Sequence, residues 1–312
     1  MRGVGRRIPP SGPFGAQVQV PGPRAEEELL ESGDTVPTDA PPIRAVVLDL
    51  DGTLLDNAKR ISPRTVRALE RCAEAGVAML VATARPPRSV RPFLPAMPFI
   101  EYAAYYNGAL VMRGPETVVH TAIPRALSGQ VSQFIREDAP HALLSYEAEE
   151  VWYTRDVWPD AEATLFRMGS DSPRPKRVDD AVVAVLSPTK ILVHGYPTWD
   201  RLSMAFPDSL NVIATDGGRL VQVMNQRASK EAAVRWMLSV LGVMPDNVLA
   251  LGDDFNGLGV FRLCGFPVAM ANAIPELKAL ARVVTSSNED DGVAWALERF
   301  VLHGEDPSRG AS

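Results

Sequence analysis

Two aspartates stand one residue apart at the end of a short apolar run, in the segment AVVLDLDGTLL (residues 45–55). The run is too short for a helix and is typical of a buried parallel strand. Alternation along a strand places Asp49 and Asp51 on the same side of its exit, with Leu50 facing away. Two carboxylates so close together are costly unless a cation or a proton lies between them. The pair therefore predicts a Mg²⁺ site that contains a nucleophilic carboxylate.

Three further polar residues stand where an α/β fold would use them. Thr83 ends the apolar run 76–83, and Asp253 follows the apolar run 249–252. In open α/β sheets, ligands bind just beyond the carboxyl ends of strands. Lys230 opens a predicted helix, where a cation is normally unfavourable and therefore indicates an anionic partner. Taken singly, each has an ordinary alternative: Asp and Gly are common turn residues, a threonine often ends a strand, and a surface lysine is solvated.

Local signals predict the elements that position these residues. Ser62 is the expected N-cap of a helix that ends at Gly76, with Val66, Leu69 and Ala73 on its inner face. Ser229 is the expected N-cap of the helix that Lys230 opens. Further strands are predicted over 143–145, 151–154, 190–194, 220–223, 247–252, 268–270 and 283–285. Further helices are predicted from Pro87 and over 128–138, 198–206, 229–241, 255–263, 275–280 and 293–302.

This order predicts an α/β fold, with a parallel-sheet core divided in sequence by an inserted α+β domain. Residues 1–42 are rich in Pro, Gly and charge, which is typical of a disordered tail. The expected organisation is a tail (1–42), the first part of the core (43–109), the insertion (110–223), the second part of the core (224–303) and a C-terminal tail (304–312).

Composition narrows the classes of partner. The 312-residue chain carries a net charge of −6 and shows no basic stripe, so nucleic acid is not an expected partner. No apolar stretch reaches membrane-spanning length. Two distant cysteines, Cys72 and Cys264, suit buried thiols in a reducing cytoplasm. Arginine heavily outnumbers lysine. The lysines are Lys59, Lys176, Lys190, Lys230 and Lys278, so a lysine at a particular place is informative.

Four segments taken together resemble the motifs of the haloacid dehalogenase (HAD) superfamily. They are DLDGTLL from Asp49, VATAR around Thr83, the helix-opening Lys230, and GDDFNG from Gly252. The resemblance covers about residues 43–303, and the insertion after the second motif is similar to the α/β cap of the Cof-like subgroup. Asn-Gly-Ala at 107–109, Ala-Met-Ala-Asn-Ala at 269–273 and Asp-Gly-Val at 291–293 extend it. The chain departs from the family at Ala84, Glu231 and Gly257, and Gly257 stands where a second metal-site aspartate is usual.

The resemblance implies a Rossmann-like core and a role for each motif residue. Asp49 would be the nucleophile that forms an aspartyl phosphate, and Asp51 the general acid and base. Thr83, Lys230 and Asn256 would bind the phosphate. Mg²⁺ would be held by Asp49, Asp253 and the backbone carbonyl of Asp51.

The expected function is therefore Mg²⁺-dependent hydrolysis of a small phosphorylated metabolite, such as a sugar phosphate, in the cytoplasm. A phosphomutase of the same fold is an alternative. A catalytically weakened binding or regulatory protein is another, with Gly257 as its main support. The sequence leaves the oligomeric state open.

Overall fold

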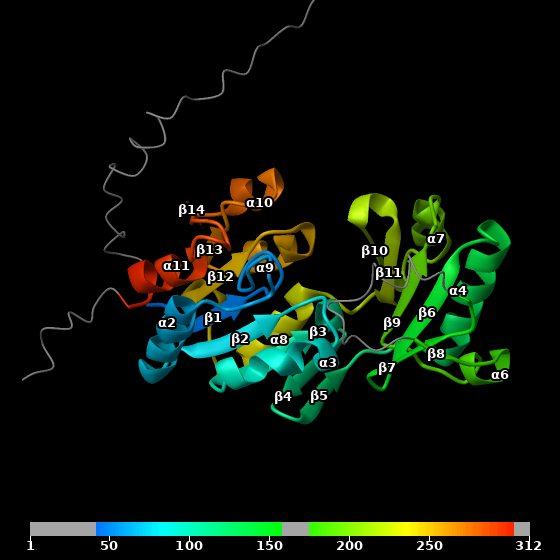
Figure 1. Ribbon diagram of the computed structural model, residues 1–312, viewed down its shortest axis with the longest axis horizontal. Coiled ribbons are helices and arrows are strands. Elements are labelled where there is room, and N and C mark those ends of the chain that lie inside the picture. Colours follow the sequence, from blue (N-terminus) through cyan, green and yellow to red (C-terminus); the bar gives the residue numbers. More distant parts are fainter. Residues whose placement is uncertain (1–41, 158–174, 303–312) are drawn as a thin grey trace, which may run out of the picture. The chain divides into compact units, whose positions relative to one another are not determined.

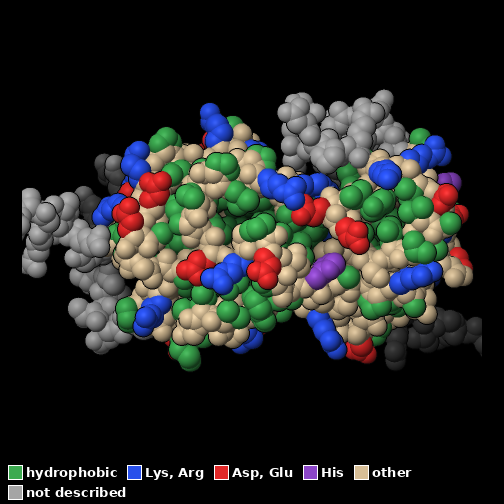
Figure 2. All heavy atoms as spheres, turned by 90° about the horizontal axis from the view of Figure 1, so that it is seen from below, with side chains coloured by type: hydrophobic (Ala, Val, Ile, Leu, Met, Phe, Trp, Pro, Cys, Tyr) green, Lys and Arg blue, Asp and Glu red, His purple; other side chains and the backbone are tan. Residues whose placement is uncertain are grey.

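The computed structural model describes residues 42–157 and 175–302 (Figure 1). The two predicted tails, apart from Pro42, lie outside these residues. Within the described ranges no helix is long and apolar enough to cross a membrane. On the face shown in Figure 2, Lys and Arg side chains are interspersed with Asp and Glu side chains.

The first sheet has eight strands and contains both halves of the predicted core. In sheet order the strands are β14 (Val283–Val284), β13 (Phe266–Ala269), β12 (Val248–Gly252), β1 (Ala45–Leu48), β2 (Ala78–Ala82), β3 (Ile100–Tyr105), β4 (Leu110–Arg113) and β5 (Glu116–His120). The blue and gold strands of Figure 1 lie side by side although they are far apart in sequence. The strands from β14 to β3 are parallel, whereas β4 and β5 are antiparallel.

Strand β1 lies between β12 and β2, where the direction of winding changes. Leu48 is in register with Leu251 of β12 and with Val81 of β2, so the carboxyl ends of the three strands are level. All four residues of β1 are buried, as a strand covered on both faces requires. An open α/β sheet binds its ligands at such a switch point.

Helices follow the parallel strands in the expected order. They are α2 (Pro63–Glu74), α3 (Pro87–Val90), α8 (Lys230–Leu241), α9 (Leu258–Leu263), α10 (Pro275–Leu280) and α11 (Gly292–Phe300). Helix α2 packs against α11, and α9 packs against both α8 and α10. The connection from β1 through α2 to β2 and the connection from β12 through α9 to β13 run in opposite directions along the sheet. Because both crossovers are right-handed, α2 with α11 covers one face of the sheet, and α9 with α8 and α10 covers the other.

The second sheet is built from the inserted segment. Its order is β10 (Leu210–Thr215), β11 (Leu220–Asn225), β9 (Lys190–His194), β6 (Leu143–Ala148), β7 (Val151–Thr154) and β8 (Lys176–Arg177). Helices α4 (Arg125–Asp138), α6 (Asp180–Val183) and α7 (Trp199–Ala205) accompany it. Ile135 of α4 and Leu202 of α7 belong to one apolar cluster with Tyr146 and Val193 of the sheet, so these helices cover one face.

Alternation along the strands gives the other face of this sheet a polar character. Glu147 and Lys190 are opposite one another in the β6–β9 register, and neither belongs to the apolar cluster. Gln222 of β11 shares their face, and all three side chains are buried. Leu192 and Met224 also lie buried on this face, so it combines a group of buried polar side chains with apolar packing.

The structure differs from the sequence-based expectations in several places, and strands β3 and β10 were not predicted. Residues 110–120 form the β4–β5 hairpin of the first sheet, although they were expected in the insertion. The helix from Pro87 is only four residues long and passes into a 3₁₀ segment (Arg91–Ala96), because Pro92 and Pro95 cannot donate helical hydrogen bonds. In α2 the buried positions include Ala68 and Cys72 with Leu69, whereas Val66 is only half-buried.

Candidate active site

Asp49 is the first residue after β1, and its carboxylate is held from two sides. Its Oδ1 accepts a hydrogen bond from the Leu50 N–H at 2.7 Å, and its Oδ2 lies 2.5 Å from Lys230 Nζ. Burial raises the pKa of Asp49, and the Lys230 ammonium opposes that rise. A carboxylate that is desolvated yet aligned by one cation is suited to nucleophilic attack.

Lys230 reaches Asp49 because the start of α8 is held close to the first sheet. Ser229 is the N-cap, as predicted, and its hydroxyl accepts from the Ala232 N–H. A Cβ at Gly108, which has φ +93°, would collide with the Ser229 carbonyl. The glycine therefore permits the approach that delivers the buried ammonium. The predicted pairing of this lysine with an anion is present in the contact with Asp49.

Asp51 has different partners. Arg85 binds it with two hydrogen bonds of 2.6 Å, from Nε and Nη2, and Lys59 Nζ lies 2.7 Å from its Oδ1. Burial alone would raise the pKa of Asp51, but the two cations lower it to about 2. Arg85 was not among the predicted site residues, and its position two residues after Thr83 was the available signal.

Asp253 follows β12, as predicted, and packs against the Asp-Gly-Thr turn. Its Oδ1 accepts a hydrogen bond of 2.9 Å from the Thr53 hydroxyl. A Cβ on Gly52, which has φ +70°, would stand only 2.7 Å from the Asp253 carboxyl carbon. Burial and the neighbouring Asp49 raise the pKa of Asp253 to about 7. Thr53, which sequence reasoning missed, orients this carboxylate.

Thr83 is fully buried at the end of β2. Its backbone N–H donates to Ala104, and its hydroxyl oxygen accepts from the Arg85 N–H at 3.2 Å. Among the described residues no acceptor is seen for the hydroxyl proton of Thr83. That proton can be donated to a phosphoryl oxygen.

Asn256 lies beside the junction that leads into the insertion. Its Nδ2 donates to Asn107 Oδ1 at 3.2 Å, and the Asn107 amide in turn donates to Gln222 Oε1 at 3.4 Å. Asn256 Oδ1 is buried and has no hydrogen-bond partner among the residues that the structure describes. The side chain thus supports the loop, and it leaves one acceptor for a water or a protonated group.

Gly257, the main departure from the family pattern, has an ordinary backbone conformation. Its φ is −85° and its ψ is −15°. A Cβ there would meet only Leu277 at 3.7 Å, which is a normal contact distance. The backbone does not require glycine at this position.

The carboxylates present fit a hard divalent cation with few protein ligands. No group of three or more His, Cys, Asp or Glu side chains within residues 42–157 and 175–302 is arranged around a metal position. Asp49 and Asp253 are nevertheless close enough for the charge of Asp49 to raise the pKa of Asp253. A cation would relieve that repulsion, and Mg²⁺ commonly binds through one or two carboxylates and retains several waters.

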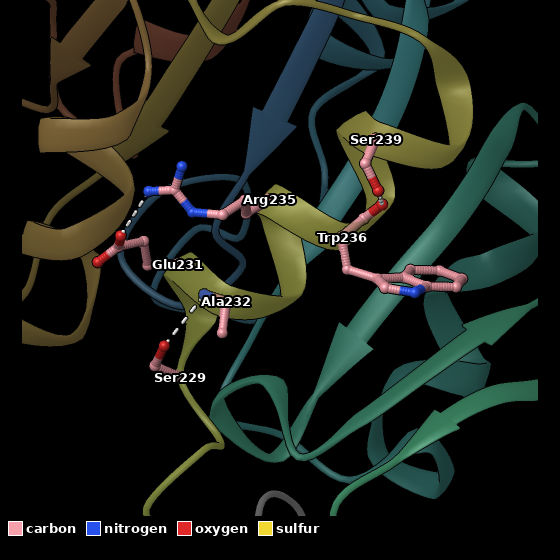
Figure 3. A pocket seen from close by; sticks show the side chains of 6 residues that line it. All are labelled: Ser229, Glu231, Ala232, Arg235, Trp236 and Ser239. Atoms are coloured by element: carbon pink, nitrogen blue, oxygen red, sulfur yellow. Dashed lines mark hydrogen bonds and ion pairs between the residues drawn. The ribbon is translucent and has the colours of Figure 1, made fainter.

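A pocket of about 520 Å³ lies on the outer side of α8 (Figure 3). Glu231 and Arg235 form an ion pair along one side of the pocket, and Trp236, which also lines it, points in the opposite direction. Lys230 points to the buried side of α8 and does not line this pocket. The pocket is therefore separate from the Asp49 site.

Comparison with known proteins agrees with this geometry. Residues 46–297 match the family of haloacid dehalogenase-like hydrolases. A putative phosphatase of Haemophilus influenzae is 30% identical over 266 residues, which cover 82% of this chain and 97% of that protein. The 5-amino-6-(5-phospho-D-ribitylamino)uracil phosphatase YitU of Bacillus subtilis is 24% identical, over 82% of this chain and 96% of that protein. A haloacid dehalogenase-like hydrolase from Bacteroides thetaiotaomicron has a similar structure, with a TM-score of 0.72, 25% identity and coverage of 82% and 99%.

The chain belongs to the haloacid dehalogenase-like hydrolases, and the predicted fold class is confirmed. Within them it is a Cof-like member, a phosphatase that hydrolyses phosphoric monoesters, as the sequence predicted.

Proposed function

We propose that the enzyme hydrolyses a small phosphorylated metabolite, such as a sugar phosphate, through an aspartyl phosphate on Asp49, with Mg²⁺ as cofactor. The observation that carries the proposal is the 2.5 Å contact between Asp49 and Lys230 beside Thr83, at the level carboxyl ends of β1 and β2. The B. subtilis relative, named for a phosphorylated ribityl compound, supports a substrate of this size.

The first step transfers the phosphoryl group to the enzyme. An oxygen of Asp49 attacks phosphorus, the bond from phosphorus to the leaving oxygen breaks, and Asp51 gives that oxygen a proton. Lys230 and the Thr83 hydroxyl hold the phosphoryl oxygens, and their fixed positions stabilise the charge that develops on them. Asn256 supports the neighbouring loop.

The second step returns the enzyme to its starting state. Asp51 takes a proton from water, the water oxygen attacks phosphorus, and the bond to Asp49 breaks to release phosphate. With its pKa held near 2 by Arg85 and Lys59, Asp51 is ionised in this arrangement, which is the form a base requires, but a carboxylate of such low pKa accepts a proton only weakly. To act as acid in the first step it must loosen its contacts with Arg85.

Mg²⁺ would be held by the carboxylates of Asp49 and Asp253 and by the backbone carbonyl of Asp51. When bound, the cation neutralises the charge of the phosphate and of the two carboxylates. Thr53 and Gly52 keep the Asp253 carboxylate in place through a hydrogen bond and through close packing.

The test measures phosphate release from a panel of phosphorylated metabolites, with phenyl phosphate as a generic substrate, with and without Mg²⁺. We expect Mg²⁺-dependent turnover that Asp49→Asn abolishes without change in thermal melting, because the substitution is nearly isosteric. Asp254→Asn is the matched control. The Asp254 side chain is exposed and, among the described residues, accepts a single hydrogen bond, from the Phe255 N–H, so this variant should retain activity.

Each part of the proposal has an outcome that contradicts it. If Asp49→Asn keeps most of the wild-type turnover, Asp49 is not the nucleophile. An isomerised phosphate ester in place of free phosphate would identify a mutase. Absence of both turnover and Mg²⁺ binding would favour the binding or regulatory alternative.

A further inference from the structure

Lys190 is a buried cation that the proposed reaction does not use. It is one of the few lysines of an arginine-rich chain, and only 5% of it is exposed. The only other buried lysine among the described residues is Lys230, which binds Asp49. Lys190 begins β9 and lies on the polar face of the second sheet.

No carboxylate within the described ranges pairs with Lys190. Its Nζ lies 3.2 Å from the Ala84 carbonyl oxygen and 3.3 Å from Gln222 Oε1. These are two long hydrogen bonds to neutral acceptors, and an ammonium has three donors. The ring of Tyr106 lies beneath it, with its centroid 5.3 Å away.

The nearest candidate counter-ion is engaged elsewhere. Glu147 is the cross-strand neighbour of Lys190, but both of its oxygens contact Arg88 at 2.6 Å. Glu147 still attracts Lys190 at longer range, and Arg88 repels it. Two cations and one carboxylate leave this buried cluster with one net positive charge.

A buried ammonium without an anion is costly to folding. Burial correspondingly lowers the pKa of Lys190 to about 8. An apolar side chain of similar volume would be buried here at a lower cost in folding free energy. The presence of an ammonium group instead points to an anionic ligand that pairs with it.

The position of Lys190 indicates which part of a ligand it would meet. Ala84, whose carbonyl Lys190 contacts, directly follows the proposed phosphate-binding Thr83. On the same face of the second sheet, the Ser145 hydroxyl is fully buried and has no hydrogen-bond partner in the described part of the chain. A buried cation thus lies next to the proposed phosphate site, and an unused hydroxyl lies on the same face of the second sheet.

We propose that Lys190 binds an anionic group on the leaving alcohol of the substrate, so that the enzyme prefers phosphate monoesters that carry a carboxylate or a second phosphate. The inference rests on the proposed function, because it assigns the leaving-group side of the same site. Lys190 acts here as a specificity-determining residue and takes no part in bond breaking.

Matched substrate pairs test this preference. For the carboxylate arm, 3-phosphoglycerate is compared with glycerol 3-phosphate, which has the same carbon skeleton with an alcohol in place of the acid. For the second-phosphate arm, fructose 1,6-bisphosphate is compared with fructose 6-phosphate. In at least one pair, the wild-type enzyme should show a higher kcat/KM for the member with the additional anionic group. The pair that shows this preference tells whether Lys190 binds a carboxylate or a second phosphate.

Lys190→Gln removes the charge and keeps a polar side chain. It should lower kcat/KM by about 10- to 100-fold for the substrate with the second anionic group, which is the value of one charge-assisted hydrogen bond. For the partner that carries only the phosphate to be hydrolysed, kcat/KM should change by less than about threefold. Lys176→Gln is the matched control, since Lys176 is an exposed lysine of the same sheet. It should leave both substrates unaffected.

The remaining outcomes overturn the inference and can be told apart from failure of the proposed function. Equal losses for both members of a pair would assign Lys190 a structural role. Hydrolysis of phenyl phosphate without any preference within the pairs would reject the inference and leave the proposed function intact. If no ester is hydrolysed, the proposed function fails. Thermal stabilisation by 3-phosphoglycerate over glycerol 3-phosphate, and its loss in Lys190→Gln, then decides whether Lys190 binds anions.

Discussion

Two glycines with nearly the same backbone conformation offer a direct test of how Asp253 is positioned. Gly52 has φ +70° and Gly76 has φ +78°. A Cβ at Gly76 would meet nothing within 4 Å, whereas a Cβ at Gly52 would stand 2.7 Å from the Asp253 carboxyl carbon. Alanine at either position incurs the left-handed strain, roughly 1–2 kcal/mol. Only Gly52→Ala also displaces a site residue.

The size of the displacement sets the expected effect. Ordinary contact with a Cβ begins at 3.4 Å, so the carboxyl carbon must move by at least about 0.7 Å, and its nearer oxygen by more. A misplacement of about 1 Å in a catalytic group costs on the order of 100-fold in rate. We therefore expect Gly52→Ala to lose about 100-fold in kcat, and Gly76→Ala to keep wild-type kcat with a similar loss of stability.

The assay is Mg²⁺-dependent phosphate release from the best substrate, with urea unfolding of both variants. The free energy of unfolding reports the backbone strain that both variants share. The difference in kcat between the two variants reports the displacement of Asp253. If Gly52→Ala keeps kcat within about threefold of Gly76→Ala at saturating Mg²⁺, the close packing of Asp253 on the turn does not matter for catalysis. A drop of kcat in both variants would trace the effect to backbone strain instead.

Three further predictions concern the metal site, a buried charge and the tail. Gly257→Asp should lower the half-maximal Mg²⁺ concentration about fivefold, the worth of one added contact of about 1 kcal/mol; an equally stable variant with unchanged Mg²⁺ dependence would contradict this. Since the pKa of Lys190 falls from 10.5 to about 8 on folding, the unfolded chain binds more protons in that window. Unfolding free energy should rise by at most about 3 kcal/mol from pH 8 to pH 10.5, and a Lys190→Met variant that shows the same rise in urea titrations would refute the cause. A chain that begins at Ile43 should match the full chain in melting temperature and turnover, and a large loss in either would show that the preceding residues contribute.

The sequence predicted those parts of the structure that depend on local signals. The strand before Asp49 and the caps at Ser62 and Ser229 are where they were expected, because an apolar run or a capping hydroxyl acts within a few residues. The contacts between side chains from distant parts of the sequence could not be predicted in this way. The binding of Asp51 by Arg85 and of Asp253 by Thr53 depends on how distant segments meet, which no local pattern encodes.

The edge of the insertion was misplaced for a similar reason. The Asn-Gly turn at 107–108 was interpreted as the border of the core, but the chain turns back there and adds β4 beside β3. A turn signal shows that the chain reverses, and it does not show which sheet the next strand joins. Strand β10 was also missed. It is defined by its antiparallel pairing with β11, and the residues of β10 alone do not indicate that pairing.

The central position of β1 has a consequence for the order of events during synthesis. Thr53 and Asp253 are 200 residues apart, and β1 borders β12 along its whole length. On a ribosome that adds about 5–20 residues per second, roughly 10–40 s separate the emergence of the two segments. Over that interval an apolar strand exposes one unpaired edge, which is the kind of surface that chaperones protect from aggregation. We expect the nascent chain to depend on such protection until β12 has emerged.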